Sequence, residues 1–136
     1  MICFRSPLGF FYKPVLDIRL GGNGKVIIMI ERIINALMNK DSEALADCFT
    51  ENCLYYDYCP ALNGSPNIYV YGNACLALLF RHLFVSGDLE VREPLIEDAD
   101  HATFFGAYYG PYVYARLHIE EYDSEGRVNK VIVTPA

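Results

Sequence analysis

Apolar residues recur with the period of an α-helix in two segments of the chain. In the first, which starts near Ile27, apolar residues at positions i, i+3, i+4 and i+7 share one helical face: Ile30, Ile33, Ile34 and Leu37. The second follows Gly72-Asn73 and repeats this spacing with Leu76, Leu79, Phe80 and Leu83. Asp41 is a favourable N-cap residue for a shorter helix between them, with four residues expected to face inward: Ala44, Leu45, Cys48 and Phe49. Three helices are therefore predicted.

The other patterned segments are typical of strands. The aromatic segment Leu54–Cys59 predicts a strand that ends at Pro60, and residues 60–68 are expected to form a loop because Pro, Asn and Gly gather there. The last third of the chain predicts four successive strands separated by short turns: Leu89–Glu97, Ala102–Tyr109, Tyr112–Tyr122 and Arg127–Thr134. Strands joined by short turns pair antiparallel, so helices followed by a strand meander indicate an α+β fold rather than a βαβ fold.

The N-terminal segment lacks a clear period, apart from a short strand expected at Val15–Leu20. We interpret residues 1–26 as an irregular arm and residues 27–136 as one domain, since this length supports a single core. Met29 opens the first strongly patterned segment, so one hypothesis is that the functional chain begins there. The intact mass of the protein made from its native gene tests this idea, and a mass that includes Met1 would reject it.

Composition narrows the classes of function. Hydrophobic residues make up 53% of the chain and charged residues 21%, which fits a folded domain. The net charge is −6 without a basic stripe, which argues against a nucleic-acid surface, and no apolar run nears the roughly 20 residues of a membrane-spanning helix. The five cysteines include no CxxC motif, and Cys48, Cys53 and Cys75 lie among apolar residues, so we expect buried, reduced thiols. We therefore predict a cytoplasmic protein without a metal or another cofactor.

The aromatic content is unusual, with 11 Tyr and 8 Phe but no Trp. Tyr joins an apolar ring to a hydroxyl group, so many Tyr residues suit a half-polar cavity or a sheet face in contact with a partner. The plainer interpretation is that Tyr favours strands, and we give it the greater weight.

Three local features, taken in order, indicate a known architecture. The turn 39–41 comes before a short helix, the pair Tyr71-Gly72 comes before the third helix, and the glycine-containing hairpin 123–128 leads into the last strand. With the order of elements over residues 27–134, these features resemble the nuclear transport factor 2-like superfamily. The resemblance implies three N-terminal helices packed in a strongly curved, mixed, mainly antiparallel sheet, which forms a cone or half-barrel with an internal pocket.

The same resemblance implies a homodimer formed through the sheet, but it leaves the activity open. The superfamily includes ketosteroid isomerases, scytalone dehydratase, limonene epoxide hydrolase and polyketide cyclases, together with proteins that only bind or assemble. A fold shared by such different proteins does not determine function, so function must be argued from a site.

Asp57 is the sharpest catalytic candidate. The segment 49–57 is similar, without gaps, to the stretch of ketosteroid isomerases that ends in their catalytic Asp, and Asp57-Tyr58 is similar to a pair in scytalone dehydratase. This resemblance implies a base that moves a proton beside a carbonyl, with its pKa raised by an apolar pocket. The alternative is a strand-end Asp that hydrogen-bonds the following loop. At the position that matches the isomerases' oxyanion-stabilising Tyr, this chain has Ile33, which cannot donate a hydrogen bond. The position that matches their second donor, an Asp, lies near His118.

Residues 112–122 alternate between two faces. One face is polar and aromatic and consists of Tyr112, Tyr114, Arg116, His118, Glu120 and Tyr122. The other face is aliphatic and consists of Val113, Ala115, Leu117 and Ile119. Simple patterning buries the aliphatic face, whereas the resemblance points His118 into the cone and turns the aliphatic face toward a dimer partner. We favour the cone, because Arg116, His118 and Glu120 could satisfy one another in a polar lining. A solvated ion pair is the alternative.

His82 and His101 are expected at the surface. His101 shares an acidic turn with Asp98 and Asp100, a set of residues that could hold a metal ion. Because three adjacent turn residues usually face water, we expect no metal there.

Two classes of function fit these residues. The first is a non-catalytic dimeric domain that binds a small apolar ligand or a protein partner, which the apolar Ile33 favours. The second is a lyase or isomerase acting on a small hydrophobic, polyketide- or steroid-like substrate, with Asp57 as general base and His118 as a second catalytic group. The residues expected to bind a ligand are Tyr55, Tyr58, Phe80, Tyr108, Tyr114 and Glu120. The enzyme requires a deep cavity with Asp57 on its wall, and a cone filled by Tyr and Phe rings would argue against it.

Overall fold

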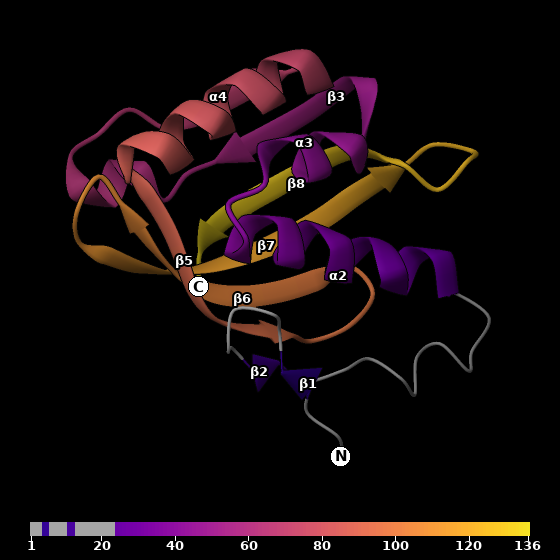
Figure 1. Cartoon of the computed structure of the whole chain (residues 1–136), viewed down its shortest axis with the longest axis horizontal. Helices are drawn as coiled ribbons and strands as arrows, with labels where there is room; N and C mark the ends of the chain where they lie inside the picture. Colours follow the sequence, from indigo (N-terminus) through magenta and orange to yellow (C-terminus); the bar gives the residue numbers. More distant parts are fainter. Residues whose placement is uncertain (1–3, 6–10, 13–23) are drawn as a thin grey trace.

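Helices lie on one side of a curved sheet (Figure 1). The computed structural model describes residues 4–5, 11–12 and 24–136, with side chains from residue 29 onward. The helices are α2 (Gly24–Met38), α3 (Ser42–Asp47), the 3₁₀ helix η1 (Pro60–Asn63) and α4 (Asn73–Ser86). The strands are β1 (Phe4–Arg5), β2 (Phe11–Tyr12), β3 (Phe49–Asp57), β4 (Ile68–Tyr71), β5 (Leu89–Ile96), β6 (His101–Tyr108), β7 (Tyr112–Tyr122) and β8 (Val128–Pro135).

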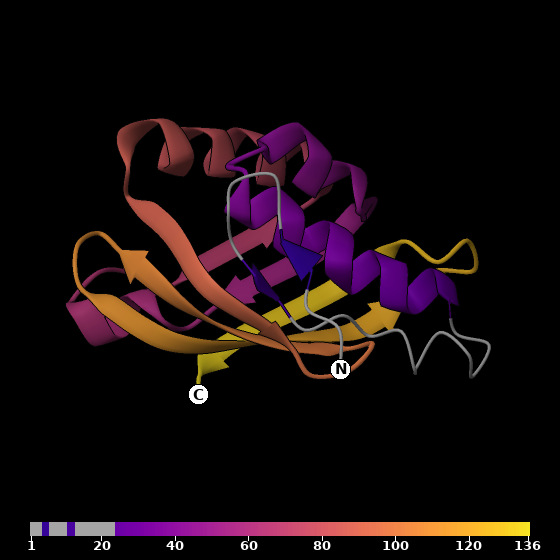
Figure 2. The ribbon, with the colours of Figure 1, turned by 60° about the horizontal axis from the view of Figure 1, so that its bottom comes forward.

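The main sheet has six strands in the order β4-β3-β8-β7-β6-β5. All neighbours are antiparallel except β3 and β8, so the last strand of the chain lies between β3 and β7. Figures 1 and 2 show α2, α3 and α4 on the same side of this sheet, which bends around them without closing. The predicted α+β class and the curved, mixed, mainly antiparallel sheet are therefore confirmed. We call the side toward the helices the inner face and the opposite side the outer face.

The helix ends have clear local causes. Asp41 caps α3 as predicted, because its Oδ1 accepts a hydrogen bond of 3.0 Å from the backbone N–H of Ala44. Gly72 precedes α4 with a φ of 89°, and a Cβ atom there would lie 3.0 Å from the carbonyl oxygen of Glu51. Gly87 ends α4 in the left-handed conformation, with a φ of 77°.

The second helix is shorter than the sequence predicts, and the following strand starts earlier. Helix α3 ends at Asp47, and Phe49 begins β3 instead of facing inward from a helix. Phe49 pairs with Val128 of β8, and Thr50 Oγ1 lies 2.6 Å from Asn129 Oδ1 in a hydrogen bond. Both contacts join residues far apart in the sequence, so tertiary pairing overrides the local helical pattern.

Strand β4 is a further correction, because it begins at the end of the loop expected over residues 60–68. Its four residues alternate, with Ile68 and Val70 buried and Tyr69 and Tyr71 exposed. Four residues are too few to establish a period in the sequence. Pairing with β3 makes β4 one edge of the main sheet.

Part of the N-terminal segment is also described. β1 and β2 form a small antiparallel pair, and β2 contacts β5. Helix α2 starts at Gly24, slightly before the predicted start near Ile27. The strand expected at Val15–Leu20 lies outside the described residues, and the division of the chain after residue 26 stays a prediction.

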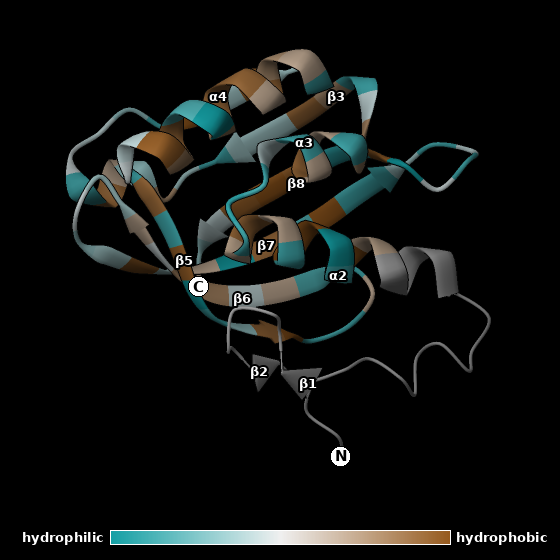
Figure 3. Cartoon of the chain, viewed as in Figure 1, coloured by the Kyte–Doolittle hydropathy of each residue, from teal (hydrophilic) through white to brown (hydrophobic). Residues whose placement is uncertain are grey.

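The core lies between the inner face and the helices. Helix α2 contacts β5 and β6, and α4 contacts β3, β4 and β5. Hydrophobic and hydrophilic residues alternate along strands such as β7 (Figure 3). The largest fully buried side chains come from both layers: Tyr55, Tyr108, Phe49, Phe80, Phe104, Ile30, Ile33, Ile34, Leu37, Leu45 and Leu76. The predicted apolar face of α2 is thus part of the core.

Candidate functional site

Asp57 is buried at the end of β3, with only 1% of the residue exposed. The backbone N–H of Cys59 donates a hydrogen bond of 2.9 Å to Asp57 Oδ1, and the hydroxyl of Tyr108 also hydrogen-bonds this carboxyl group. Burial raises the pKa of Asp57 from its ordinary value of 3.8 to about 6, although these hydrogen bonds act to lower it. Asp57 therefore accepts a hydrogen bond from the segment that follows β3. This is the structural role that the sequence offered as the alternative to a catalytic one.

Aromatic rings pack beside Asp57 on the inner face. The ring of Tyr55 meets that of Phe80 edge to face, with centroids 5.2 Å apart. A Cβ atom on Gly106 would lie 2.5 Å from Cε2 of Tyr108, so the glycine makes room for that ring. Tyr55, Phe80 and Tyr108, three of the predicted ligand-binding residues, are each at most 1% exposed. In this conformation they pack within the core and present no surface to a ligand.

Among the surface pockets lined by described residues are three that Asp57 does not line. One of about 250 Å³ lies between α2 and α3 and is lined by Arg32, Asn35, Ala36, Asn39, Asp41, Ala44 and Asp47. One of about 250 Å³ lies at the β5 side of the sheet and is lined by Arg92, Glu93, Phe105 and Tyr112. One of about 300 Å³ lies on the outer face and is lined by His101, Arg116, His118, Glu120, Ile132 and Thr134.

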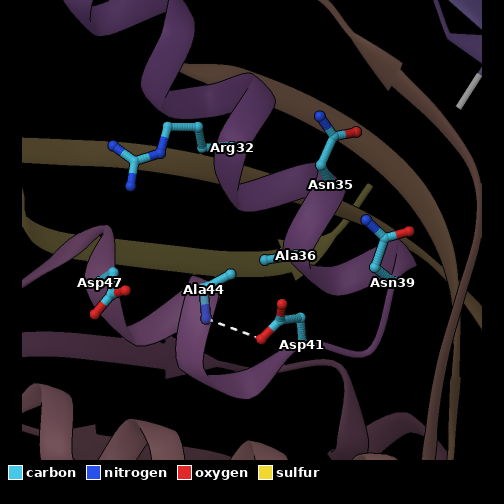
Figure 4. A pocket seen from close by; sticks show the side chains of 7 residues that line it. All are labelled: Arg32, Asn35, Ala36, Asn39, Asp41, Ala44 and Asp47. Atoms are coloured by element: carbon cyan, nitrogen blue, oxygen red, sulfur yellow. Dashed lines mark hydrogen bonds between the residues drawn. The ribbon is translucent and has the colours of Figure 1, made fainter. Parts of the chain in front are cut away.

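The pocket between α2 and α3 is polar, but its groups do not converge. Figure 4 shows Arg32, Asn35 and Asp47 pointing in different directions rather than toward a shared point. One carboxylate oxygen of Asp41 is already used by the N–H of Ala44. A specific ligand site requires a few convergent polar groups, which this pocket lacks.

His118 lies on the outer face, where the residue is partly exposed. The aliphatic residues of β7 are buried toward the helices, so the expectation that His118 points into the cone is wrong and simple patterning is right. His118 is paired directly with His101 of β6, and the two rings stack with centroids 4.3 Å apart and planes at 13°. Asp57 and His118 therefore lie on opposite faces of the sheet and cannot act on one substrate atom.

Oppositely charged side chains form pairs on the outer face. Three ion pairs form, Arg92–Glu90 and Arg116–Glu97 at 2.9 Å each and Lys130–Glu120 at 3.9 Å. Glu120, which was predicted to bind a ligand, is thus partnered by Lys130. Partly exposed pairs contribute little stability, but they leave these three cations compensated.

Aromatic side chains form two clusters on the outer face. Tyr114 lies beside Phe105, with ring centroids 4.8 Å apart. Tyr69 meets Tyr56 at 5.5 Å and Tyr58 at 5.8 Å, both edge to face. The predicted ligand-binding residues Tyr58 and Tyr114 therefore lie on the outer face, separated by the sheet from the other aromatic members of the predicted set.

His101 and Phe105 are outer-face residues that the sequence did not identify as site residues. The available signal was the hairpin between β6 and β7, whose register sets His101 opposite His118 and Phe105 opposite Tyr114. His82 is exposed on α4, as expected.

The described part of the chain contains no group of three or more His, Cys, Asp or Glu that could hold a metal ion. The thiols of Cys48 and Cys53 are free and buried, as expected, and so is that of Cys59. Cys75 is exposed, so its expected burial is wrong. Among the helices that the structure describes, none is long and apolar enough to cross a membrane.

The chain has the nuclear transport factor 2-like fold, as three helices within a curved six-stranded sheet indicate. A SnoaL-like protein of unknown function from Burkholderia thailandensis matches at 17% identity and a TM-score of 0.53, over 84% of this chain and 96% of that one. A steroid delta-isomerase from Pseudomonas aeruginosa matches at 10% identity and a TM-score of 0.56, over 82% and 80%. An LEH-like epoxide hydrolase from M. tuberculosis matches at 18% identity and a TM-score of 0.52, over 83% and 84%.

These identities are low, so the likeness concerns the fold alone. No protein-family model and no curated protein matches the sequence.

Proposed function

We propose that the protein is a non-catalytic domain that binds a second copy of itself through the outer face of its sheet. The observation that carries this proposal is a sheet face rich in exposed apolar and aromatic residues, opposite the face that packs on the described helices. Its exposed large residues are Tyr58, Tyr69, Tyr71, Leu95, Phe105, Tyr112 and Tyr114. Single exposed apolar residues are ordinary, but a set that spans one sheet face is typical of an interaction surface.

The size of the outer face supports a second copy as the occupant. Six strands about 4.8 Å apart span roughly 24 Å, and eight residues per strand span roughly 26 Å. The projected area is roughly 600 Å², and side-chain relief increases the accessible area above that value. A standard protein interface buries about 800 Å² on each partner, so one copy of this face is of suitable size for another.

Charge also supports self-association. The chain carries a net charge of −6, which would make two copies repel one another over most surfaces. On the outer face, the ion pairs made by Arg92, Arg116 and Lys130 match each cation with a carboxylate. These three pairs therefore add no net charge where two such faces meet.

The interior supports the non-catalytic part of the proposal. Asp57 is engaged by Cys59 and Tyr108, and the surrounding core is occupied by packed rings. One observation favours the alternative of a lyase or isomerase, namely the pKa of Asp57 near 6, which suits a general base. That alternative also needs space for a substrate beside the carboxyl group, and Asp57 lines none of the three pockets described above.

The experiment is a molar-mass measurement by light scattering at about 10–100 µM, a range suited to moderate affinities. The wild-type chain is expected to have the mass of a dimer. Tyr114→Lys, beside Phe105 within the proposed surface, is expected to have the mass of a monomer while keeping its circular dichroism spectrum. Leu78→Lys is the matched control, because Leu78 is 67% exposed on α4, away from the sheet. A monomeric wild type, or equal effects of the two variants, would reject the proposal.

A further inference from the structure

The His101–His118 pair lies in the middle of the outer face. In the strand register, one row of side chains crosses five strands from β4 to β6: Tyr69, Tyr56, Ile132, His118 and His101. This row joins the tyrosine cluster to the pocket of about 300 Å³ that the two histidines help to line. Any partner that covers the outer face must therefore cover both imidazole rings.

One of the two imidazoles has a fixed hydrogen-bond partner. His101 Nδ1 lies 2.8 Å from Asp98 Oδ1. Burial acts to raise the pKa of Asp98, but hydrogen bonds from the backbone N–H of Asp100 and from His101 outweigh it, so the net shift is downward. Asp98 is thus a carboxylate at neutral pH, and His101 Nδ1 carries the hydrogen that it accepts. A positive charge in the pair is therefore best placed on His101.

Among the described residues, no carboxylate is hydrogen-bonded to His118, so a second positive charge there would have no partner of its own. The nearby charged groups are already in pairs, Glu97 with Arg116 and Glu120 with Lys130. Strand β8 presents Ile132 and Thr134 to this pocket, which carry no charge. Protonation of His118 would place a second cation 4.3 Å from the ring of His101. In water this repulsion is weak, but it grows several-fold when a partner excludes water.

We propose that two copies of the chain associate over the His101–His118 pair with His118 uncharged, so that acidification separates them. This inference rests on the proposed self-association and specifies where it is centred and what controls it. Each copy then takes up one proton when the dimer dissociates. One proton for each copy makes two for each dimer, so the dissociation constant is expected to rise between pH 7.5 and pH 5.5, by up to about 100-fold for each pH unit over which both protons bind.

The test measures the dissociation constant by sedimentation equilibrium at pH 7.5 and pH 5.5. His118→Gln removes the titrating group, so this variant should associate at pH 7.5 and lose most of the pH dependence. His82→Gln is the matched control, because His82 is exposed on α4, and it should behave as the wild type. Asp57 also titrates near pH 6, but it is retained in both variants, so a dependence due to Asp57 would persist in His118→Gln.

Each outcome has a distinct meaning. A wild-type dimer whose dissociation constant is the same at both pH values overturns this inference and leaves the proposed self-association intact. A pH dependence that survives in His118→Gln also overturns it. A chain that is monomeric at both pH values rejects the proposed function together with the inference. If His118→Gln fails to associate or fold, His101→Gln provides the second test, because without the stacked partner the pH dependence should likewise be lost.

Discussion

Replacing Asp57 by Asn tests the buried carboxyl group directly. The pKa of Asp57 is raised from 3.8 to about 6, so between these pH values the folded chain holds a proton that the unfolded chain has lost. Stability contributed by this group is therefore complete below about pH 4 and decreases as the pH rises to 6. The shift corresponds to about 3 kcal/mol, which is a large share of the roughly 5–15 kcal/mol that holds a typical domain folded.

The substituted asparagine side chain would have nearly the same shape as the protonated acid but cannot ionise. The free energy of unfolding of Asp57→Asn, minus that of the wild type, should therefore increase by about 3 kcal/mol from pH 4 to pH 7. Urea unfolding followed by circular dichroism at several pH values gives this difference, in which the contributions of all other groups cancel. Asp47→Asn is the control, because Asp47 is exposed on α3, and its profile should parallel the wild type. Parallel profiles for Asp57→Asn would refute the argument that burial governs this carboxyl group.

Three further outcomes follow from the packing. Gly106→Ala should destabilise the fold by about 1–3 kcal/mol in thermal or urea unfolding, because the added Cβ would clash with the ring of Tyr108; unchanged stability would contradict this placement. Asp41→Ala should cost about 1 kcal/mol in the same assay through loss of the α3 cap, and a smaller helical signal should accompany it. When native protein is treated with a thiol reagent, Cys75→Ser should remove one fast-reacting thiol, because Cys75 is exposed. Cys59→Ser should remove none, because Cys59 is buried and burial raises the pKa of its thiol. The reverse result would place Cys59 at the surface.

The elements that the sequence predicts well are those with a sustained period. The apolar stripe of α2 spans two helical turns, and the alternation of β7 runs over 11 residues, so both patterns reflect a buried face directly. The α3–β3 boundary and β4 could not be located in the same way. They depend on pairing between Phe49 and Val128 and between β3 and β4, which are contacts across the sequence rather than along it.

The candidate site was predictable only in part, for a related reason. Alternation along β7 assigns His118 to the outer face, and the resemblance to ketosteroid isomerases led to the opposite choice. The burial of Asp57 agrees with the sequence, but the sequence does not reveal whether a cavity or packed rings would surround it. That outcome depends on how Tyr55, Phe80 and Tyr108 fill the space between two layers, and such packing is not encoded in any local pattern.

The central claim is that this protein acts by self-association through the outer face of its sheet, rather than by binding a ligand in its interior. Hydroxyl-radical footprinting with mass spectrometry, at about 0.1 µM and about 100 µM protein, tests it directly across a range in which moderate self-association changes. Phe105 and Tyr114, which are 38% and 45% exposed in a single copy, should become protected at the higher concentration. Leu78 and Val85 on α4, 67% and 83% exposed, should be oxidised equally at both. Equal oxidation of the outer face at both concentrations, or protection of α4 instead, would contradict the account.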